Sequence, residues 1–151
     1  MPETRDIATI ELELTLLVRA AEAARRHRSY PMEPAQYLHM RTLMAEGPQT
    51  TASLAARLRL DSSTVTRQLA AMETAGLIVR TPHPTDSRSH LIAPTDAGRE
   101  RTEAMRAGRE ARIERIVGTW RDDERRALAR LMGKFSRGIL AQIETETADS
   151  D

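Results

Sequence analysis

The first part of the chain has apolar side chains at helical spacing. Between Ile7 and about Arg28 they recur three and four positions apart and form one stripe, made of Ile7, Ile10, Leu14, Leu17, Val18, Ala21 and Ala24. The sequence Ser29-Tyr30-Pro31 marks the end of this pattern. Pro34 suits the first turn of a second helix, which runs to Met44 and stops at Gly47-Pro48. We predict a long amphipathic helix followed by a shorter one.

Two further short helices are predicted in the middle of the chain. Thr51 precedes a helix of about two turns over Leu54 to Leu58. Asp61 suits the N-cap of the next helix, because its carboxylate can accept hydrogen bonds from the free amides of the first turn. Gly76 is placed to end that helix, and its inward-facing residues are expected to be Val65, Leu69 and Met72.

A β-hairpin is predicted after these helices. Leu77 to Thr81 and Ser89 to Ala93 are short runs of residues suited to strands. The segment between them, Pro82 to Arg88, is too long for a tight turn and is unsuited to a helix. We therefore predict a hairpin with a protruding loop.

Two long helices complete the pattern. The first starts at Thr95 or Asp96, and its apolar positions are Met105, Ile113, Ile116, Val117 and Trp120. The second begins near Asp122, where early acidic residues suit the positive end of a helix. Its apolar residues alternate at spacings of three and four: Leu128, Leu131, Met132, Phe135, Ile139 and Ile143.

Composition narrows the class of protein. Hydrophobic residues make up 40% of the 151 residues and aromatic residues only 3%, so a single core must be mostly aliphatic, as in packed helices. The absence of cysteine excludes disulfides, thiolate metal ligands and cysteine-based catalysis or redox sensing. No apolar run approaches about 18 residues and no secretion signal is recognised, so we expect a cytoplasmic protein with no membrane span. The net charge of +1 gives no argument for nucleic-acid binding.

The order of the predicted elements matches a winged helix-turn-helix, in which the second of two short helices enters the major groove of DNA. Arg67 can read guanine there, Gln68 can read adenine, and hydroxyl groups can contact bases or phosphates. The hydroxyl residues on the first turns of this helix are Ser62, Ser63, Thr64 and Thr66. For an isolated helix, a simple helix start with a solvated arginine is the better interpretation. Because the order of the elements matches a winged helix-turn-helix, we prefer the interpretation that these residues contact DNA.

Five motifs resemble the MarR family of transcription factors in order and spacing. They are Leu54-Ala55-Ala56-Arg57-Leu58, Asp61-Ser62-Ser63-Thr64-Val65-Thr66-Arg67, Ala75-Gly76-Leu77-Ile78, Asp86-Ser87-Arg88 and Thr95-Asp96-Ala97-Gly98. The resemblance implies a single, mainly α-helical domain over residues 1–151, with a winged lobe over 34–94 and a small β-hairpin wing. It also implies a homodimer, held by long dimerisation helices over 5–30 and 96–145, that grips a pseudo-palindromic operator in double-stranded DNA.

In this family an Asp-x-Arg element lies in the wing, with its arginine in the minor groove or on the DNA backbone, and here it maps to Asp86 and Arg88. A narrow minor groove concentrates negative potential, which suits a guanidinium on a loop tip. A turn contact between Asp86 and Arg88 without DNA is the alternative. Ser87 stands where a second arginine is frequent and Pro94 where leucine is common. These departures predict weaker backbone affinity and a looser strand end.

Many members of the family bind small aromatic or anionic effectors in a cleft between the dimerisation helices and the winged lobe. The residues that the resemblance places there are Arg19, Ala23, His27, Tyr30, Tyr37, Met40 and Met44. They suit a ligand cleft and equally suit ordinary helix packing. We expect a repressor that is released by a ligand. The alternatives are an activator, a regulator without an effector, and a module for protein-protein assembly.

No enzyme is predicted, and no cofactor or metal is expected. The sequence has no nucleophile elbow, phosphate-binding glycine loop or spaced carboxylate pair. None of His27, His39, His83 and His90 forms a recognised metal-ligand pair, and a metal sensor with His and acidic ligands is a further alternative. His83 and His90 flank the wing loop and can contact phosphate when they are protonated.

Overall fold

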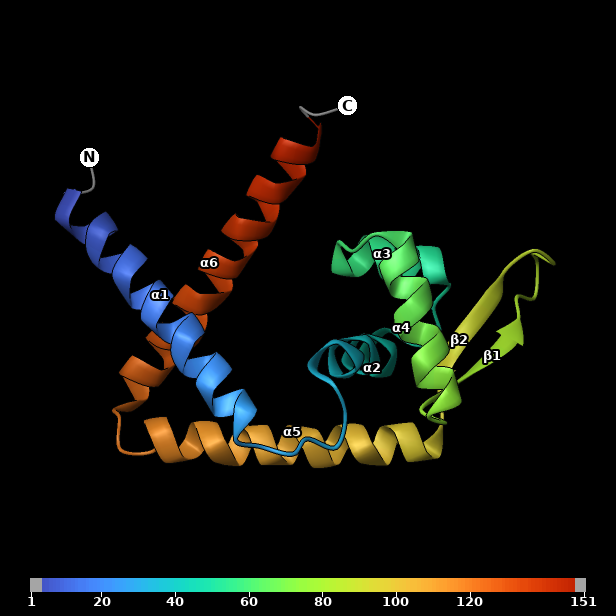
Figure 1. The fold of residues 1–151 in the computed structure, drawn as a ribbon, viewed down its shortest axis with the longest axis horizontal. Helices are drawn as coiled ribbons and strands as arrows, with labels where there is room; N and C mark the ends of the chain where they lie inside the picture. The colour runs from blue at the N-terminus through green and yellow to red at the C-terminus, as the bar shows by residue number, and fades with distance from the viewer. Residues whose placement is uncertain (1–3, 149–151) are drawn as a thin grey trace. The chain divides into compact units, whose positions relative to one another are not determined.

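The computed structural model describes residues 4–148 and is mainly helical with one β-hairpin, as the sequence predicts (Figure 1). It divides into two units. The first, up to Tyr30, contains α1 (Thr4–Arg26). The second, from Pro31 on, contains α2 (Pro34–Glu46), α3 (Thr51–Leu58), α4 (Ser62–Thr74), β1 (Ile78–Pro82), β2 (His90–Pro94), α5 (Asp96–Val117) and α6 (Asp122–Ala148).

Side-chain caps explain where α3 and α4 begin. The Thr50 hydroxyl accepts a hydrogen bond from the backbone N–H of Ser53 at 3.1 Å. The Asp61 carboxylate accepts one from the backbone N–H of Thr64 at 2.7 Å, which confirms the predicted N-cap of α4. Each cap satisfies an amide that has no partner within its own helix.

A Schellman motif ends α4 at the glycine that the sequence singled out. Gly76 has a φ of 69°, and its N–H bonds the carbonyl of Glu73 at 2.9 Å. The N–H of Leu77 bonds the carbonyl of Met72 at 2.9 Å. Because the Leu77 amide is used by this cap, β1 begins at Ile78, one residue later than the pattern predicts.

The hairpin is antiparallel and is tied to the start of α3. Its register sets Ile78 opposite Pro94, so both strands lie one residue further along the chain than predicted. Gln49, which precedes α3, exchanges two backbone hydrogen bonds with Ile92 of β2, at 2.8 and 3.1 Å. These bonds hold the base of the wing against the helix-turn-helix.

The core of the second unit gathers one apolar face from each element of the winged lobe. Contacts join α2, α3, α4, the hairpin and α5. The three residues predicted to face inward on α4 are all fully buried. The fully buried apolar side chains are Met40, Leu43, Leu54, Val65, Leu69, Met72, Leu77, Ile92 and Met105. Burial of this aliphatic surface is the main force that holds the lobe together.

The N-terminus of α5 packs directly on the end of α4. The Thr95 hydroxyl donates to the carbonyl of Gly76 at 2.6 Å and accepts from the N–H of Gly98 at 3.0 Å. Gly98 lies so close to Leu77 that a Cβ at this position would sit 2.0 Å from the Leu77 carbonyl oxygen. α5 is therefore fixed to the segment that joins the second helix to the wing.

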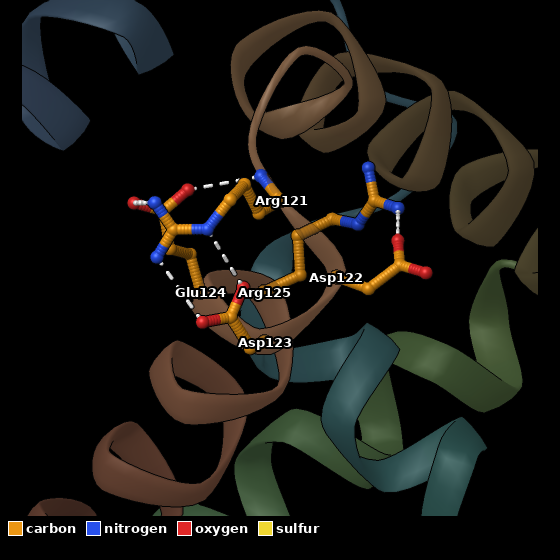
Figure 2. A network of polar contacts seen from close by, with 5 residues as sticks. All are labelled: Arg121, Asp122, Asp123, Glu124 and Arg125. Atoms are coloured by element: carbon orange, nitrogen blue, oxygen red, sulfur yellow. Dashed lines mark hydrogen bonds and ion pairs between the residues drawn. The ribbon is translucent and has the colours of Figure 1, made fainter.

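A polar network fixes the turn between α5 and α6 (Figure 2). Arg121 Nε bonds the carboxylate of Asp123 at 3.0 Å, and this guanidinium holds the pKa of Asp123 below its usual range. Arg125 bonds Asp122 and also donates to the carbonyl oxygen of Gly118, at the end of α5, at 3.2 Å. These bonds set the direction in which α6 leaves α5.

α6 exposes a row of large apolar side chains. They recur at spacings of three and four, and each is between 37% and 51% exposed: Leu128, Leu131, Met132, Phe135, Ile139 and Ile143. On α1, Ile7, Ile10, Leu17 and Val18 are about half exposed. Over residues 4–148, no helix combines the length and the apolar character needed to cross a membrane.

Candidate nucleic-acid interface

The first two turns of α4 present a polar outer face and an apolar inner face. Ser62, Ser63 and Arg67 are exposed, whereas Val65 and Leu69 are fully buried. Thr66 is also exposed, and Thr64 is half-buried. The residues predicted to contact DNA from this helix therefore lie together on its outer face, apart from Gln68.

Three hydroxyl groups on this face are already engaged in hydrogen bonds. The hydroxyls of Ser63 and Thr64 donate to the Asp61 carboxylate at 2.5 and 2.6 Å, and the Thr66 hydroxyl donates to the carbonyl of Ser62 at 2.7 Å. The two hydroxyl bonds to Asp61, with the amide bond of the cap, hold the pKa of Asp61 far below its usual range. Because each hydroxyl proton is used in these bonds, each hydroxyl oxygen can only accept a further hydrogen bond.

Arg67 is the strongest donor on the outer face of α4. Its guanidinium makes no ion pair or hydrogen bond with any described residue in the structure. A planar guanidinium with free N–H groups matches the two acceptor atoms of guanine in the major groove. This geometry supports the role predicted for Arg67.

Gln68 occupies a different environment from its neighbours. It is half-buried, and its Oε1 lies 2.6 Å from Nε2 of His39 on α2, a fully buried histidine. A two-bond contact with adenine uses both the oxygen and the nitrogen of the amide. Such a contact therefore requires Gln68 to exchange its bond with His39, and base reading by Gln68 stays a prediction.

In the wing, Asp86 shapes the loop that presents Arg88. The Asp86 carboxylate accepts a hydrogen bond from the backbone N–H of Arg88 at 2.9 Å, which is the main reason that the pKa of Asp86 lies below its usual range. The N–H of Ser89 bonds the carbonyl of Asp86 at 3.2 Å. The side chain of Arg88 is exposed. The hydrogen bonds within the loop therefore hold this arginine out into solvent.

A hollow of about 460 Å³ lies between the start of α3 and the wing. Its helix side is formed by Thr50, Thr51 and Ala52, and its wing side by Arg80, His83, Asp86, Arg88, Ser89 and His90. The sequence pattern places His83 and His90 beside the wing but does not place the start of α3 opposite them. The pairing of Gln49 with Ile92 brings the two sides together.

On α2, Tyr37 is enclosed by two arginines. The guanidinium carbon of Arg109, on α5, lies 5.1 Å from the centre of the Tyr37 ring, and that of Arg41 lies 5.7 Å from it. Arg41 also donates to the Tyr37 hydroxyl at 2.9 Å. Met40 is fully buried in the core, and Met44 is half-buried. Arg109 was not predicted, since no local pattern links it to Tyr37.

The remaining residues predicted for a ligand cleft belong to the first unit. Arg19 and Ala23 lie on α1 and are exposed. His27 follows that helix and is also exposed, and Tyr30 is half-buried. A ligand role for these four residues stays a prediction. Within residues 4–148, no three histidine, aspartate or glutamate side chains gather as a metal site would require.

The second of two short helices has an exposed polar face, and a hairpin with an outward arginine follows it. This combination defines a winged helix-turn-helix protein. The MarR family model matches residues 32–90. The HTH-type transcriptional regulator YxaD of Bacillus subtilis (strain 168) is 30% identical over 142 residues, which cover 93% of this chain and 99% of YxaD. The chain therefore belongs to the MarR family of transcriptional regulators.

Solved structures have the same fold. A MarR family protein from Bacillus stearothermophilus matches with a TM-score of 0.67 at 25% identity, over 89% of this chain and 97% of that one. The PcaV transcriptional regulator from Streptomyces coelicolor, in complex with its natural ligand, also gives a TM-score of 0.67. It is 21% identical and covers 81% of this chain and 89% of its own. At that identity the likeness concerns the fold alone.

Proposed function

We propose that this protein is a homodimeric repressor that binds a pseudo-palindromic operator in double-stranded DNA and is released by a small aromatic or anionic effector. The observation that carries the proposal is the outer face of α4, where Arg67 and the hydroxyl residues are exposed above a buried apolar face. A helix of this kind fits the major groove with its N-terminal turns at the base edges. The exposed Arg88 then reaches the adjacent minor groove or backbone.

Selection of genomic DNA fragments with the purified protein tests this proposal and reveals the operator. We expect enrichment of a pseudo-palindrome, bound with a steep dependence on salt. The double variant Arg67→Ala/Arg88→Ala should lose this enrichment, whereas Arg115→Ala, an exposed change near the far end of α5, should keep it. Absence of any salt-sensitive duplex binding would instead favour a protein-protein assembly module.

The exposed apolar rows on α1 and α6 support a homodimer. An apolar row of this length is costly to leave in water, and a second copy of the chain offers a matching surface. Light scattering should give twice the mass of one chain. Leu131→Glu on α6 should shift the protein to monomer or aggregate, whereas Arg126→Glu, on the opposite face of the helix, should leave the dimer intact. A wild-type monomer at micromolar concentration would overturn this part.

The two arginines around Tyr37 support an anionic or aromatic effector. An anion can pair with Arg41 or Arg109, and an aromatic ring can pack beside Tyr37. Thermal shift measurements with phenols and aromatic carboxylates test this, with Arg109→Gln as the variant that should lose the response. If no compound stabilises the wild type or releases it from DNA, the protein is a regulator without an effector of this class.

A further inference from the structure

The hollow between α3 and the wing is lined by two arginines and two histidines. Arg80 and His90 lie on the strands, His83 and Arg88 lie in the loop, and Thr51 lines the hollow from the start of α3. Such a set of guanidinium, imidazole and hydroxyl donors is typical of a site for an oxyanion.

Two carboxylates lie beside these four basic side chains, and one of them, on Asp86, interacts with His83. Arg80 Nε bonds the carboxylate of Glu73, on α4, at 2.8 Å. Asp86 lies in the same loop as Arg88 and supplies a second negative charge to the hollow. The start of α3 contributes no charged residue to the lining. The formal charges of the two arginines and the two carboxylates therefore cancel, and the net charge of the hollow follows the protonation of its two histidines.

The backbone holds both histidines at the loop end of the hairpin. His90 of β2 pairs with Pro82 of β1, and the N–H of His83 bonds the carbonyl of Ser89 at 3.1 Å. The Nδ1 of His83 accepts a hydrogen bond from the backbone N–H of Thr85 at 3.3 Å, and the Thr85 hydroxyl lies at the same distance from it. A proton added at Nδ1 replaces the bond from the amide, whereas the hydroxyl oxygen can accept a bond from the protonated ring. The backbone bonds that pair the two strands do not involve either ring.

We propose that this hollow binds a backbone phosphate of the operator and that protonation of His83 and His90 strengthens the contact. The inference rests on the proposed function, because the wing must lie against DNA for a phosphodiester to reach the hollow. Protonation of either imidazole ring adds a positive charge to the hollow, so the affinity for duplex DNA rises as protons are taken up.

The salt dependence gives this idea a quantitative form. Each cation that neutralises a DNA phosphate steepens the dependence of log affinity on log salt by about 0.9. The slope for the wild type should therefore be steeper at pH 6 than at pH 8, by up to about 0.9 per protomer, because the hollow holds one phosphate. Proton uptake on binding, read from calorimetry in buffers of different ionisation enthalpy, should be positive near neutral pH.

The test uses the full-length protein and a duplex obtained by selection, with affinity measured at several salt concentrations at pH 6 and pH 8. The double variant His83→Gln/His90→Gln keeps polar side chains at both positions and should lose most of the pH dependence and the proton uptake. Arg115→Gln, which changes an exposed basic residue near the far end of α5, should behave as the wild type. Circular dichroism at both pH values checks that each variant is folded.

The outcomes separate this inference from the proposed function. Duplex binding with the same pH dependence and proton uptake in the double variant would overturn the histidine site and leave DNA binding intact. Failure of the wild type to bind any duplex at either pH would overturn both. Stabilisation by inorganic phosphate without DNA, at constant ionic strength and lost in the double variant, would assign the hollow to a free anion and overturn its assignment to the DNA backbone.

Discussion

His39 Nε2 lies 2.6 Å from Oε1 of Gln68, and this hydrogen bond joins α2 to the DNA-binding helix α4. Because a carbonyl oxygen only accepts, the ring donates from Nε2, and Nδ1 is a buried acceptor without a partner in the described part of the chain. Gln68 directly follows Arg67 along α4. The bond therefore fixes the stretch of helix from which the exposed guanidinium projects.

Removing one partner of this pair should lower the free energy of unfolding more than removing both partners. His39→Leu leaves the Gln68 carbonyl oxygen half-buried and unpaired, which should lower the free energy of unfolding by about 1–3 kcal/mol. His39→Leu/Gln68→Leu replaces both partners by apolar groups and should recover much of that loss. Urea unfolding measures the values, with the exposed His27→Leu as control, expected within about 0.5 kcal/mol of wild type. Additive losses in the double variant would contradict a coupled pair.

Substitution by alanine should have opposite effects on stability at two glycines that lie in helices. Gly98→Ala places a methyl group against the Leu77 carbonyl oxygen, so α5 must move, and overpacking of this kind costs typically about 1–3 kcal/mol. A methyl group added at Gly138 on α6 would meet no atom within 4 Å beyond its own stretch of helix backbone, so Gly138→Ala should stabilise by about 0.5–1 kcal/mol through helix propensity. Thermal unfolding of both variants checks the contrast. Equal effects would contradict the close packing at Gly98.

Local patterns predicted most of the fold, because caps and periodicity act over a few residues. Asp61 caps α4 and Gly76 ends it, as expected. Both strands begin one residue later than predicted. Leu77 is a residue type suited to strands, but its amide forms a hydrogen bond that ends the preceding helix. The outer face of α4 follows from the same periodicity, which places Arg67 opposite the buried Leu69.

Contacts between distant parts of the chain could not be read in this way. His39 and Gln68 are 29 positions apart, and periodicity alone shows only that each lies near an inner face. The position of Arg109 over Tyr37 depends on the packing of α5 against α2. The hollow at the wing likewise requires the bridge between Gln49 and β2. Tertiary geometry decides such sites, and short-range pattern carries little information about it.

The cap of α4 should make stability sensitive to acid. Folding lowers the pKa of Asp61 through the hydroxyls of Ser63 and Thr64, so the charged form stabilises the fold above the pKa of the unfolded chain, about 4, and this contribution is lost as pH falls below it. The melting temperature of the wild type should fall more steeply between about pH 5 and pH 2 than that of Asp61→Asn. Asp61→Ala should show the same flattening and also a lower melting temperature at pH 7, because the cap itself is lost.

Arg67 should determine base preference rather than only affinity. Arg67→Ala is expected to relax the preference at one position of each half-site and to cost about 1–3 kcal/mol of binding there. Arg67→Lys keeps the charge but lacks the planar fork, so it should preserve the salt slope and still lose discrimination. Binding selections with the three proteins provide the comparison. An unchanged preference in Arg67→Ala would leave this arginine with a positioning role at most.

Arg88 should act through charge and groove width, because the minor groove distinguishes little beyond A·T from G·C. Arg88→Ala should weaken binding to all duplexes similarly and reduce the dependence of log affinity on log salt by about 1 per subunit. Ser87→Arg adds a second guanidinium to the same loop and should tighten binding more at low salt than at high salt.

The main effect of Asp86 should be to hold the loop, through its bond to the N–H of Arg88. Asp86→Ala releases the backbone that presents this guanidinium, so its effect on DNA affinity should largely disappear when Arg88 is already alanine. Affinities of the two single variants and of the double variant, each measured over a range of salt, complete the cycle. Full additivity of the two substitutions, or a salt slope that does not change without Arg88, would mean that the wing is a structural hairpin that makes no contact with DNA.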